Sequence, residues 1–312
     1  MNCSCPMTDP FGRKITDVRI AVNSACNLNC LYCHSEGEGD NGCVRSPAHT
    51  RLSAVDVGEI TCCLADLGVT TIKLTGGEPL LCPDICDIIR AIPSSIQVSL
   101  TTNGTLLAEK AADLKAAGLT RVNISIDSLD PDRYAKITGK NMLDKVLNGL
   151  DAAVAAGLTP IKINMVILPG INDDEIDDFI RFVQGKEELI LQVIELMDLN
   201  GWANALPSSA RHSSEIVENL EERLKSEAEE VVTRRMHHRR KYYLDKAAIE
   251  IVRPMHNAEF CRNCNRLRIT SDKYLKPCLL QTGNEISLDG LHGDEIPAAI
   301  AKAVAARKPY FT

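Results

Sequence analysis

Short runs of β-branched and aliphatic residues alternate with amphipathic stretches over the first two thirds of the chain. The runs predict strands, and the stretches with apolar residues three and four positions apart predict helices. The predicted strands are 18–23, 70–75, 96–102, 121–126, 160–168 and 189–196, and the predicted helices are 54–67, 83–91, 106–116, 142–156 and 173–183. Strands that read as nearly continuous apolar runs, each followed by a helix, favour a parallel sheet covered by helices.

Helix boundaries support this reading. Ser53 is a predicted N-cap with Asp56 three residues on, and Gly68, Gly118 and Gly157 each follow a predicted helix. Six strand–helix units are too few for a closed eight-stranded barrel, so the fold class predicted is α/β, a partial (βα)6 barrel of the TIM type.

The alternation stops near residue 200. A charged helix at 214–228, two short strands at 242–244 and 249–252, and a last helix at 295–306 follow it. We therefore expect a barrel domain over residues 1–200 and a C-terminal α+β extension over 201–312.

Unusual residues cluster where the predicted strands end, at 23–33, 76–79, 102–104, 125–128 and 195–197. The carboxyl ends of parallel barrel strands meet on one face, which is where such folds place their functional groups. We expect the active site on that face.

Composition narrows the class of function. With 45% hydrophobic and 25% charged residues the chain is typical of globular proteins, and a net charge of −7 argues against a general nucleic-acid binder. The net negative charge is compatible with an anionic small substrate that is bound by a local group of cations. No apolar run approaches the ~18 residues of a membrane span, and the start shows no signal peptide. Thirteen cysteines then suggest a reducing, cytoplasmic setting, with thiols serving as metal ligands or buried side chains.

Six of the cysteines form two triplets, Cys26-x3-Cys30-x2-Cys33 and Cys261-x2-Cys264-x13-Cys278. Each triplet is one thiolate short of the four that close an ordinary iron–sulfur or structural zinc site. A [4Fe–4S] cluster on three cysteines would leave one iron open to a ligand that is not protein. Zinc sites completed by His34 or His256 are the alternatives, and spacing alone does not decide between them.

The first triplet, with Tyr32 before its last cysteine, resembles the hallmark of the radical S-adenosylmethionine (SAM) superfamily. Gly76-Gly77-Glu78-Pro79 strengthens the resemblance, because glycines allow close approach to a ligand and a carboxylate suits the SAM ammonium group. The resemblance implies a [4Fe–4S] cluster that cleaves SAM to a 5′-deoxyadenosyl radical. It assigns SAM binding to Tyr32, Gly76, Gly77, Glu78, Thr102, Ser125 and Met197. The alternatives are a capping role for Glu78 and core packing for Met197.

The stretch from Phe260 to Thr270, with Cys278 beyond it, resembles the GTP 3′,8-cyclase family of molybdenum cofactor biosynthesis. The resemblance implies a second [4Fe–4S] cluster, whose open iron binds guanine. It assigns GTP contacts to Arg19, Lys73, Lys162, Arg266 and Arg268. Arg266 and Arg268 alternate, so in a strand they share one face, as a triphosphate would require; a solvated charged face is the alternative.

The implied reaction takes the 3′ hydrogen of GTP and joins C3′ to guanine C8. Its implied partners are an electron donor protein, the next enzyme of molybdopterin synthesis and a second copy of the chain in a homodimer. A radical SAM enzyme acting on a peptide is the alternative, and a non-catalytic zinc or electron-transfer module is a further one.

Some features depart from the family or carry no clear signal. Gln192 stands where a functional arginine is frequent, Lys73 stands where an arginine is frequent, and the Gly-Gly C-terminus is missing. The sequence from His34 to Gly37 resembles the corresponding segment of archaeal members of the family. The basic run 234–241 reads as a solvated face, with triphosphate contact as the alternative. No metal spacing connects Cys3, Cys5, Cys43, Cys62 and Cys63. Cys82 and Cys86 could share a helix face at i, i+4, and a third metal site there is the weaker alternative to an ordinary structural role.

Overall fold

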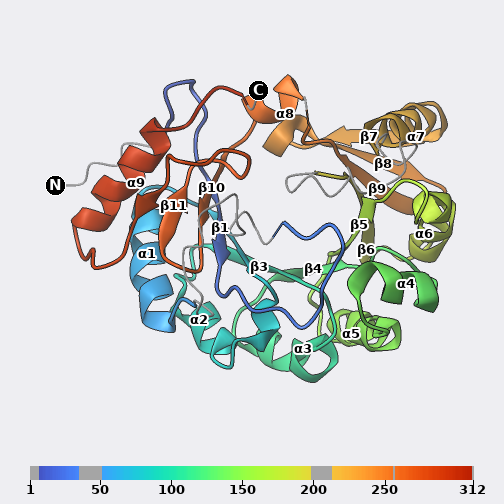
Figure 1. The fold of residues 1–312 in the computed structure, drawn as a ribbon, viewed down its shortest axis with the longest axis horizontal. Helices are drawn as coiled ribbons and strands as arrows, with labels where there is room; N and C mark the ends of the chain where they lie inside the picture. Colours follow the sequence, from blue (N-terminus) through green and yellow to red (C-terminus); the bar gives the residue numbers. More distant parts are fainter. Residues whose placement is uncertain (1–6, 35–50, 198–212, 256, 311–312) are drawn as a thin grey trace.

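One sheet runs through the structure, a computed structural model that describes residues 7–34, 51–197, 213–255 and 257–310. Within these residues its strands lie in the order β12-β11-β10-β1-β2-β3-β4-β5-β6-β9-β8-β7 (Figure 1). The first six are β1 (Asp17–Ala21), β2 (Thr71–Thr75), β3 (Gln97–Thr102), β4 (Arg121–Ser125), β5 (Ile161–Ile167) and β6 (Leu189–Glu195). Each pairs in parallel with the next, which confirms the predicted partial barrel.

The helices that follow these strands lie on the outside of the curved sheet (Figure 1). They are α1 (Ala54–Asp66), α2 (Ile85–Ala91), α3 (Leu107–Ala116), α4 (Pro131–Thr138), α5 (Leu143–Ala155) and α6 (Ile176–Val183), with short 3-10 turns η2 (Pro79–Leu81) and η3 (Asp173–Glu175). The expected capping box of Ser53 and Asp56 is present at the start of α1. Sequence reasoning missed α4, although Asp130 caps it, Pro131 opens it and Gly139 ends it at φ 77°.

The strands are not continuous apolar runs, and this corrects the sequence reading. In β4, Val122 and Ile124 are 0% exposed and belong to the core under the helices, whereas Arg121, Asn123 and Ser125 line a cavity on the other face. Alternate side chains of a strand point to opposite faces. One face of the barrel sheet is therefore an ordinary apolar core, and the other is polar.

The C-terminal region lengthens the barrel sheet at both ends. Its strands are β7 (Glu230–Thr233), β8 (Arg240–Leu244), β9 (Ala247–Val252), β10 (Arg266–Ile269), β11 (Tyr274–Lys276) and β12 (Ile286–Ser287), and its helices are α7 (Ser213–Glu227), α8 (Ala258–Arg262) and α9 (Glu295–Ala305). β9 pairs in parallel with β6, and β10 pairs in parallel with β1. Eight parallel strands in the described chain thus form an open barrel. The division between 1–200 and 201–312 stays a prediction, and its boundary at residue 200 lies outside the described residues.

The two flanks of the open barrel meet near α8, which lies above the gap between β10 and β9 in Figure 1. The backbone N–H of His237, in the turn η6 (Met236–His238), donates to the Asn263 carbonyl at 3.0 Å. The His237 ring stacks on Phe260 with 3.8 Å between ring centroids. These contacts join the β7–β8 hairpin to the loop of the second cysteine triplet. No helix of the described chain has the length and apolar character to cross a membrane.

Candidate active site

A cavity of about 350 Å³ lies against the polar face of the sheet. Residues of the barrel strands and residues of the C-terminal region line it together. The predicted site residues along its wall are Arg19, Tyr32, Lys73, Ser125, Lys162, Met197, Cys261, Cys264, Arg266, Arg268 and Cys278. The others, Cys26, Cys30, Cys33, Gly76, Gly77, Glu78 and Thr102, are not part of the wall.

The first cysteine triplet sits in the loop after β1. This loop is fixed to the end of α4, because the Asn29 N–H donates to the Thr138 carbonyl and the Leu31 N–H donates to the Ile137 carbonyl, each at 2.9 Å. Burial raises the pKa of the Cys30 thiol well above its ordinary value, and Asp127 and the other two thiols of the triplet raise it further. As a donor set, three thiols in one anchored loop fit the predicted [4Fe–4S] cluster.

The loop that carries the first cysteine triplet, called the cluster loop below, packs so closely on Gly76 and Gly77 that both positions require glycine. A Cβ on Gly76 would lie 2.4 Å from the Asn23 carbonyl oxygen, and one on Gly77 would lie 2.3 Å from the Ala25 carbonyl oxygen. The Gly77 N–H donates to the Asn23 carbonyl at 3.0 Å, and the Glu78 N–H donates to the Ala25 carbonyl at 2.7 Å. The close approach predicted for these glycines is therefore made to backbone. Their contact with SAM stays a prediction.

Glu78 is fully buried and is surrounded by protein donors. Its carboxylate accepts from the Leu80 N–H at 2.9 Å, from the Thr102 hydroxyl at 2.7 Å and from the Asn103 N–H at 2.7 Å. Burial raises the pKa of Glu78 to about 7, against the effect of these three donors. The capping role considered for Glu78 is present in the structure, since it is the N-cap of η2. SAM contacts of Glu78 and Thr102 stay predictions.

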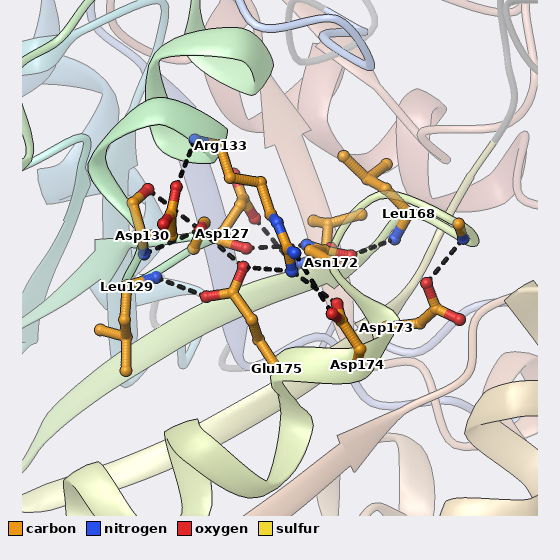
Figure 2. Close-up of polar contacts among 12 residues, drawn as sticks. Asp127, Leu129, Asp130, Arg133, Leu168, Asn172, Asp173, Asp174 and Glu175 are labelled. Carbon is orange, nitrogen blue, oxygen red and sulfur yellow. Dashed lines mark hydrogen bonds and ion pairs between the residues drawn. The ribbon is translucent and has the colours of Figure 1, made fainter.

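Tyr32 is held by Asp127, a residue that sequence reasoning did not single out. The Tyr32 hydroxyl donates to Asp127 Oδ2 at 2.6 Å, and the Val166 N–H donates to Oδ1 at 2.9 Å. The Asn172 side chain donates to the Asp127 backbone carbonyl at 2.8 Å, as Figure 2 shows. Burial raises the pKa of Asp127 to about 6. Asp127 thus positions an aromatic side chain of the cluster loop at the cavity wall.

The same region binds the loop after β4 to the loop after β5 (Figure 2). Glu175 accepts from the Leu129 N–H at 2.8 Å and from the Ser128 hydroxyl at 2.7 Å, and it pairs with Arg133 at 2.8 Å. Asp174 also pairs with Arg133. The carboxyl ends of these two strands are therefore rigidly joined beside Ser125, a predicted SAM residue.

A row of cations crosses the sheet at one level. Arg19 of β1 is in register with Arg268 of β10 on one side and with Lys73 of β2 on the other. The row continues through Ser99 to Arg121, which also lines the cavity. Burial holds the pKa of Lys73 well below its ordinary value, and Arg19 lowers it further. Sequence reasoning missed Arg121, although it begins a predicted strand whose alternate positions are polar.

Two of the predicted GTP residues are paired with buried carboxylates. The Arg266 Nε donates to Asp17 Oδ1, and this pairing, working against burial, lowers the pKa of Asp17. Lys162 Nζ lies 2.5 Å from Glu250 Oε2. Burial would raise the pKa of Glu250, but the surrounding cations outweigh it and hold that pKa well below its ordinary range.

The second cysteine triplet lines the cavity on the side of the C-terminal region. Arg13 Nη1 donates to the Cys261 carbonyl at 2.9 Å, and Arg307 Nη2 donates to the Cys264 carbonyl at 2.9 Å. Three thiols facing a polar cavity fit a cluster with an iron open to a ligand there. In the described chain no three His, Cys, Asp or Glu side chains are placed to hold a single metal ion. His256, the alternative zinc ligand, lies outside the described residues.

The structure corrects the reading of the basic run as a solvated face. Arg234, Met236, His237 and Arg239 all line the cavity. Lys308, Pro309 and Tyr310 of the C-terminal tail line it too. Among the cysteines outside the two triplets, Cys62, Cys63, Cys82 and Cys86 are not part of the cavity wall, and Cys3, Cys5 and Cys43 lie outside the described residues.

Fold and site together define the class of radical SAM proteins. The sequence model of the radical SAM superfamily matches residues 20–183, more than half of the chain, and that of Molybdenum Cofactor Synthesis C matches residues 189–312. The structure of Streptococcus suis SuiB bound to S-adenosylmethionine is similar, with a TM-score of 0.63 and 15% identity over 90% of this chain and 63% of that one, less than two thirds of its length. Native anSMEcpe with bound AdoMet gives a TM-score of 0.62 and 16% identity over 94% of this chain and 81% of that one. At such identities the likeness shows the fold alone.

Three archaeal relatives specify the family. Each is named "Probable GTP 3′,8-cyclase". The protein of Methanocella arvoryzae is 49% identical over 98% of this chain and 94% of its own. Those of Methanosarcina mazei and Archaeoglobus fulgidus are 46% and 43% identical over 98% of this chain and 90% and 99% of their own. The chain therefore belongs to the radical SAM superfamily and, within it, to the family of these archaeal proteins. Membership of the superfamily brings a [4Fe–4S] cluster and SAM as cofactors.

Proposed function

We propose that the chain is a GTP 3′,8-cyclase of molybdenum cofactor biosynthesis, which converts GTP to 3′,8-cyclo-7,8-dihydro-GTP. One observation carries the proposal: a single cavity is lined by the second cysteine triplet and by the cation row of Arg268, Arg19, Lys73 and Arg121. In a nucleoside triphosphate the base could bind at the cysteine triplet and the chain of phosphates could bind along the cation row. The name of the archaeal relatives supports the same substrate.

The chain's own residues would divide the work as follows. Cys26, Cys30 and Cys33 hold the cluster that, when bound with SAM, supplies the 5′-deoxyadenosyl radical. Gly76, Gly77, Glu78, Thr102, Ser125, Met197 and Tyr32 hold SAM or the loop beside it. Cys261, Cys264 and Cys278 hold a second [4Fe–4S] cluster that takes the guanine. Lys162 and Arg266 join the cation row in binding the triphosphate, the Arg266 guanidinium through bidentate, charge-assisted hydrogen bonds to phosphate and the Lys162 ammonium as a point charge.

The peptide alternative has no support. SuiB has also been solved with a precursor peptide, but at 16% identity that likeness extends to the fold alone. The non-catalytic zinc or electron-transfer module is also disfavoured, because it gives no reason for a cationic cavity beside the cysteines.

Partners beyond GTP follow from the reaction. An electron donor protein would reduce the first cluster, and the next enzyme of molybdopterin synthesis would take the product. A homodimer and a cytoplasmic location, the latter suggested by the thirteen cysteines, complete the proposal.

Anaerobic turnover tests the proposal directly. The reconstituted protein, incubated with GTP, SAM and a strong reductant, should yield the 3′,8-cyclised nucleotide together with 5′-deoxyadenosine. Incubation with ATP in place of GTP is the control. Formation of 5′-deoxyadenosine without any modified GTP would refute the assignment of substrate.

A further inference from the structure

The hairpin tip, residues 234–239 between β7 and β8, is the part of the basic run that reaches the cavity. The Arg234 N–H donates to the Arg239 carbonyl at 2.8 Å and closes the tip. His237 and His238 have φ of 59° and 48°, a conformation that side chains other than glycine seldom adopt. The contacts of His237 with Asn263 and Phe260 hold the tip to the opposite flank. The hairpin tip is therefore a fixed part of the cavity wall.

A single buried carboxylate gathers the cations at the hairpin tip. Glu250 of β9 is 0% exposed, and Arg239 Nη1 lies 2.8 Å from its Oε1. Its Oε2 accepts from Arg234 Nη1 at 3.1 Å and from Lys162 Nζ at 2.5 Å. One carboxylate balances one of these three cations. At least one positive charge is in excess, because both guanidinium groups stay charged while burial lowers the pKa of Lys162 to about 7. All three side chains line the cavity.

Arg239 has hydrogen-bonding capacity that the protein does not use. Its side chain is 14% exposed, and its Nε is buried with no hydrogen-bond partner in the described chain. Among the residues that the structure describes, its Nη2 donates to the sulfur of Met236 alone, at 3.7 Å. A buried donor without a partner loses its hydration and gains no hydrogen bond in return, so a ligand oxygen in the cavity would stabilise it.

Like charges from both walls of the cavity act on one another. Burial lowers the pKa of Arg239 to about 10; Glu250 opposes this, and Arg266 and Arg234 add to it. Arg121 of the cation row in turn experiences the charge of Arg234. The hairpin tip and the cation row thus form one field, which a polyanion would stabilise more than a neutral molecule would.

We propose that Arg234 and Arg239 of the hairpin tip bind the triphosphate of the substrate from the side facing the cation row, and that Glu250 positions both guanidinium groups. The inference rests on the proposed function, because GTP supplies the triphosphate. Neutralising Glu250 alone would require one guanidinium group, and the hairpin tip provides two.

Equilibrium dialysis of the anaerobically reconstituted enzyme with GTP and with guanosine tests the inference. Arg239→Gln and Arg234→Gln should each weaken GTP binding about ten- to hundredfold, the scale of a lost hydrogen bond to a charged group. Guanosine affinity should stay the same. Arg235→Gln is the matched control, because Arg235 is exposed on the same tip and is not part of the cavity wall, and it should change neither affinity.

Each outcome of the dialysis experiment either supports or overturns the role of the hairpin tip. GTP affinities within twofold of the Arg235→Gln control would overturn the inference, as would equal losses for GTP and guanosine, which indicate a structural role. If Arg239→Gln does not fold, Arg234→Gln decides alone, because that side chain is 36% exposed and its loss is readily accommodated. A wild-type enzyme that binds guanosine as tightly as GTP would instead refute the proposed substrate site. Normal GTP binding in wild type with unaffected variants would refute the hairpin tip only.

Discussion

The hydroxyl of Tyr32 donates a 2.6 Å hydrogen bond to the buried carboxylate of Asp127, and so joins the first cysteine loop to the end of β4. This bond lies between the loop that would carry the cluster and the network that fixes the loops after β4 and β5. The order of the cluster loop therefore depends on a carboxylate that the sequence motif does not contain.

We predict that Tyr32→Phe lowers the free energy of unfolding by about 1.5–3 kcal/mol at pH 8, where Asp127 is ionised and loses its strongest donor. The folded pKa of Asp127, about 6, is raised above its unfolded value. Its contribution to stability is thus complete below about pH 4 and is lost as the pH rises through about 6. The cost of Tyr32→Phe should therefore be smaller at pH 5.

Urea unfolding of the cluster-free protein at pH 5 and pH 8 measures this difference. Tyr243→Phe is the control: the Tyr243 ring faces the Lys241 ammonium at 4.6 Å, and the change should have little effect at either pH. An identical cost for Tyr32→Phe at both pH values would show that the hydroxyl does not act through the charge of Asp127.

The cysteine triplets should separate in function. Cys30→Ala removes a predicted ligand of the cluster that would activate SAM, so it should abolish 5′-deoxyadenosine formation. Cys264→Ala should leave some 5′-deoxyadenosine formation while eliminating cyclised nucleotide, because only the triplet lining the cavity is affected. Product analysis with parallel iron determination measures both. If Cys264→Ala stops SAM cleavage while the first cluster is intact, the division of roles is wrong.

Substitution of the two arginines of β10 should affect the stability of the protein differently. Arg268→Ala should weaken GTP binding by about 1.5–3 kcal/mol, the scale of a lost charge-assisted hydrogen bond. Arg266→Ala should weaken GTP binding and also destabilise the protein, because it leaves Asp17 buried without its principal cation. The lowered pKa of Asp17 means that its stabilising pair is present above about pH 4 and is lost as the pH falls below that value. Dialysis and denaturation together test the contrast, which fails if both variants unfold alike.

Sequence reasoning located strands β1 to β6, because nearly all their positions that face the helices are apolar, but β7, β10, β11 and β12 were not among its predicted strands. The sequence did not reveal that the face of the barrel sheet turned away from the helices is polar. Lys73 and Lys162 were assigned to GTP binding by resemblance alone, and Arg121 was missed, because a cationic side chain in a strand has no local pattern until cross-strand register places several of them on one wall. Register depends on pairing between distant segments, as when Arg268 comes to lie beside Arg19. No local pattern contains that information.

The cysteine triplets were readable because each is a local motif, whereas their supports are not. Asp127 and Glu250 contribute through burial, which brings a carboxylate to residues far away in the sequence. The basic run was misread for the same reason: its charges meet Glu250 only after the hairpin folds onto β9. Spacing thus predicts ligands, and tertiary packing decides what holds them.

The last prediction concerns Arg307, whose side chain is 3% exposed just after α9. It donates to the carbonyls of Cys264 at 2.9 Å and Arg266 at 3.1 Å, and it pairs with Asp9 at 3.2 Å. Arg307→Met removes all three contacts, so the loop of the second triplet should lose its geometry. We expect anaerobic reconstitution to give about four irons per chain in place of about eight, because one of two [4Fe–4S] clusters is lost.

SAM cleavage distinguishes a specific loss of the second cluster from a general destabilisation of the protein. SAM cleavage should persist in Arg307→Met, while cyclised product should disappear. Lys302→Met is the control, because Lys302 is an exposed cation on α9 itself. It should retain both clusters. Full iron content and normal cyclisation in Arg307→Met would show that the loop of Cys264 holds its shape without the guanidinium.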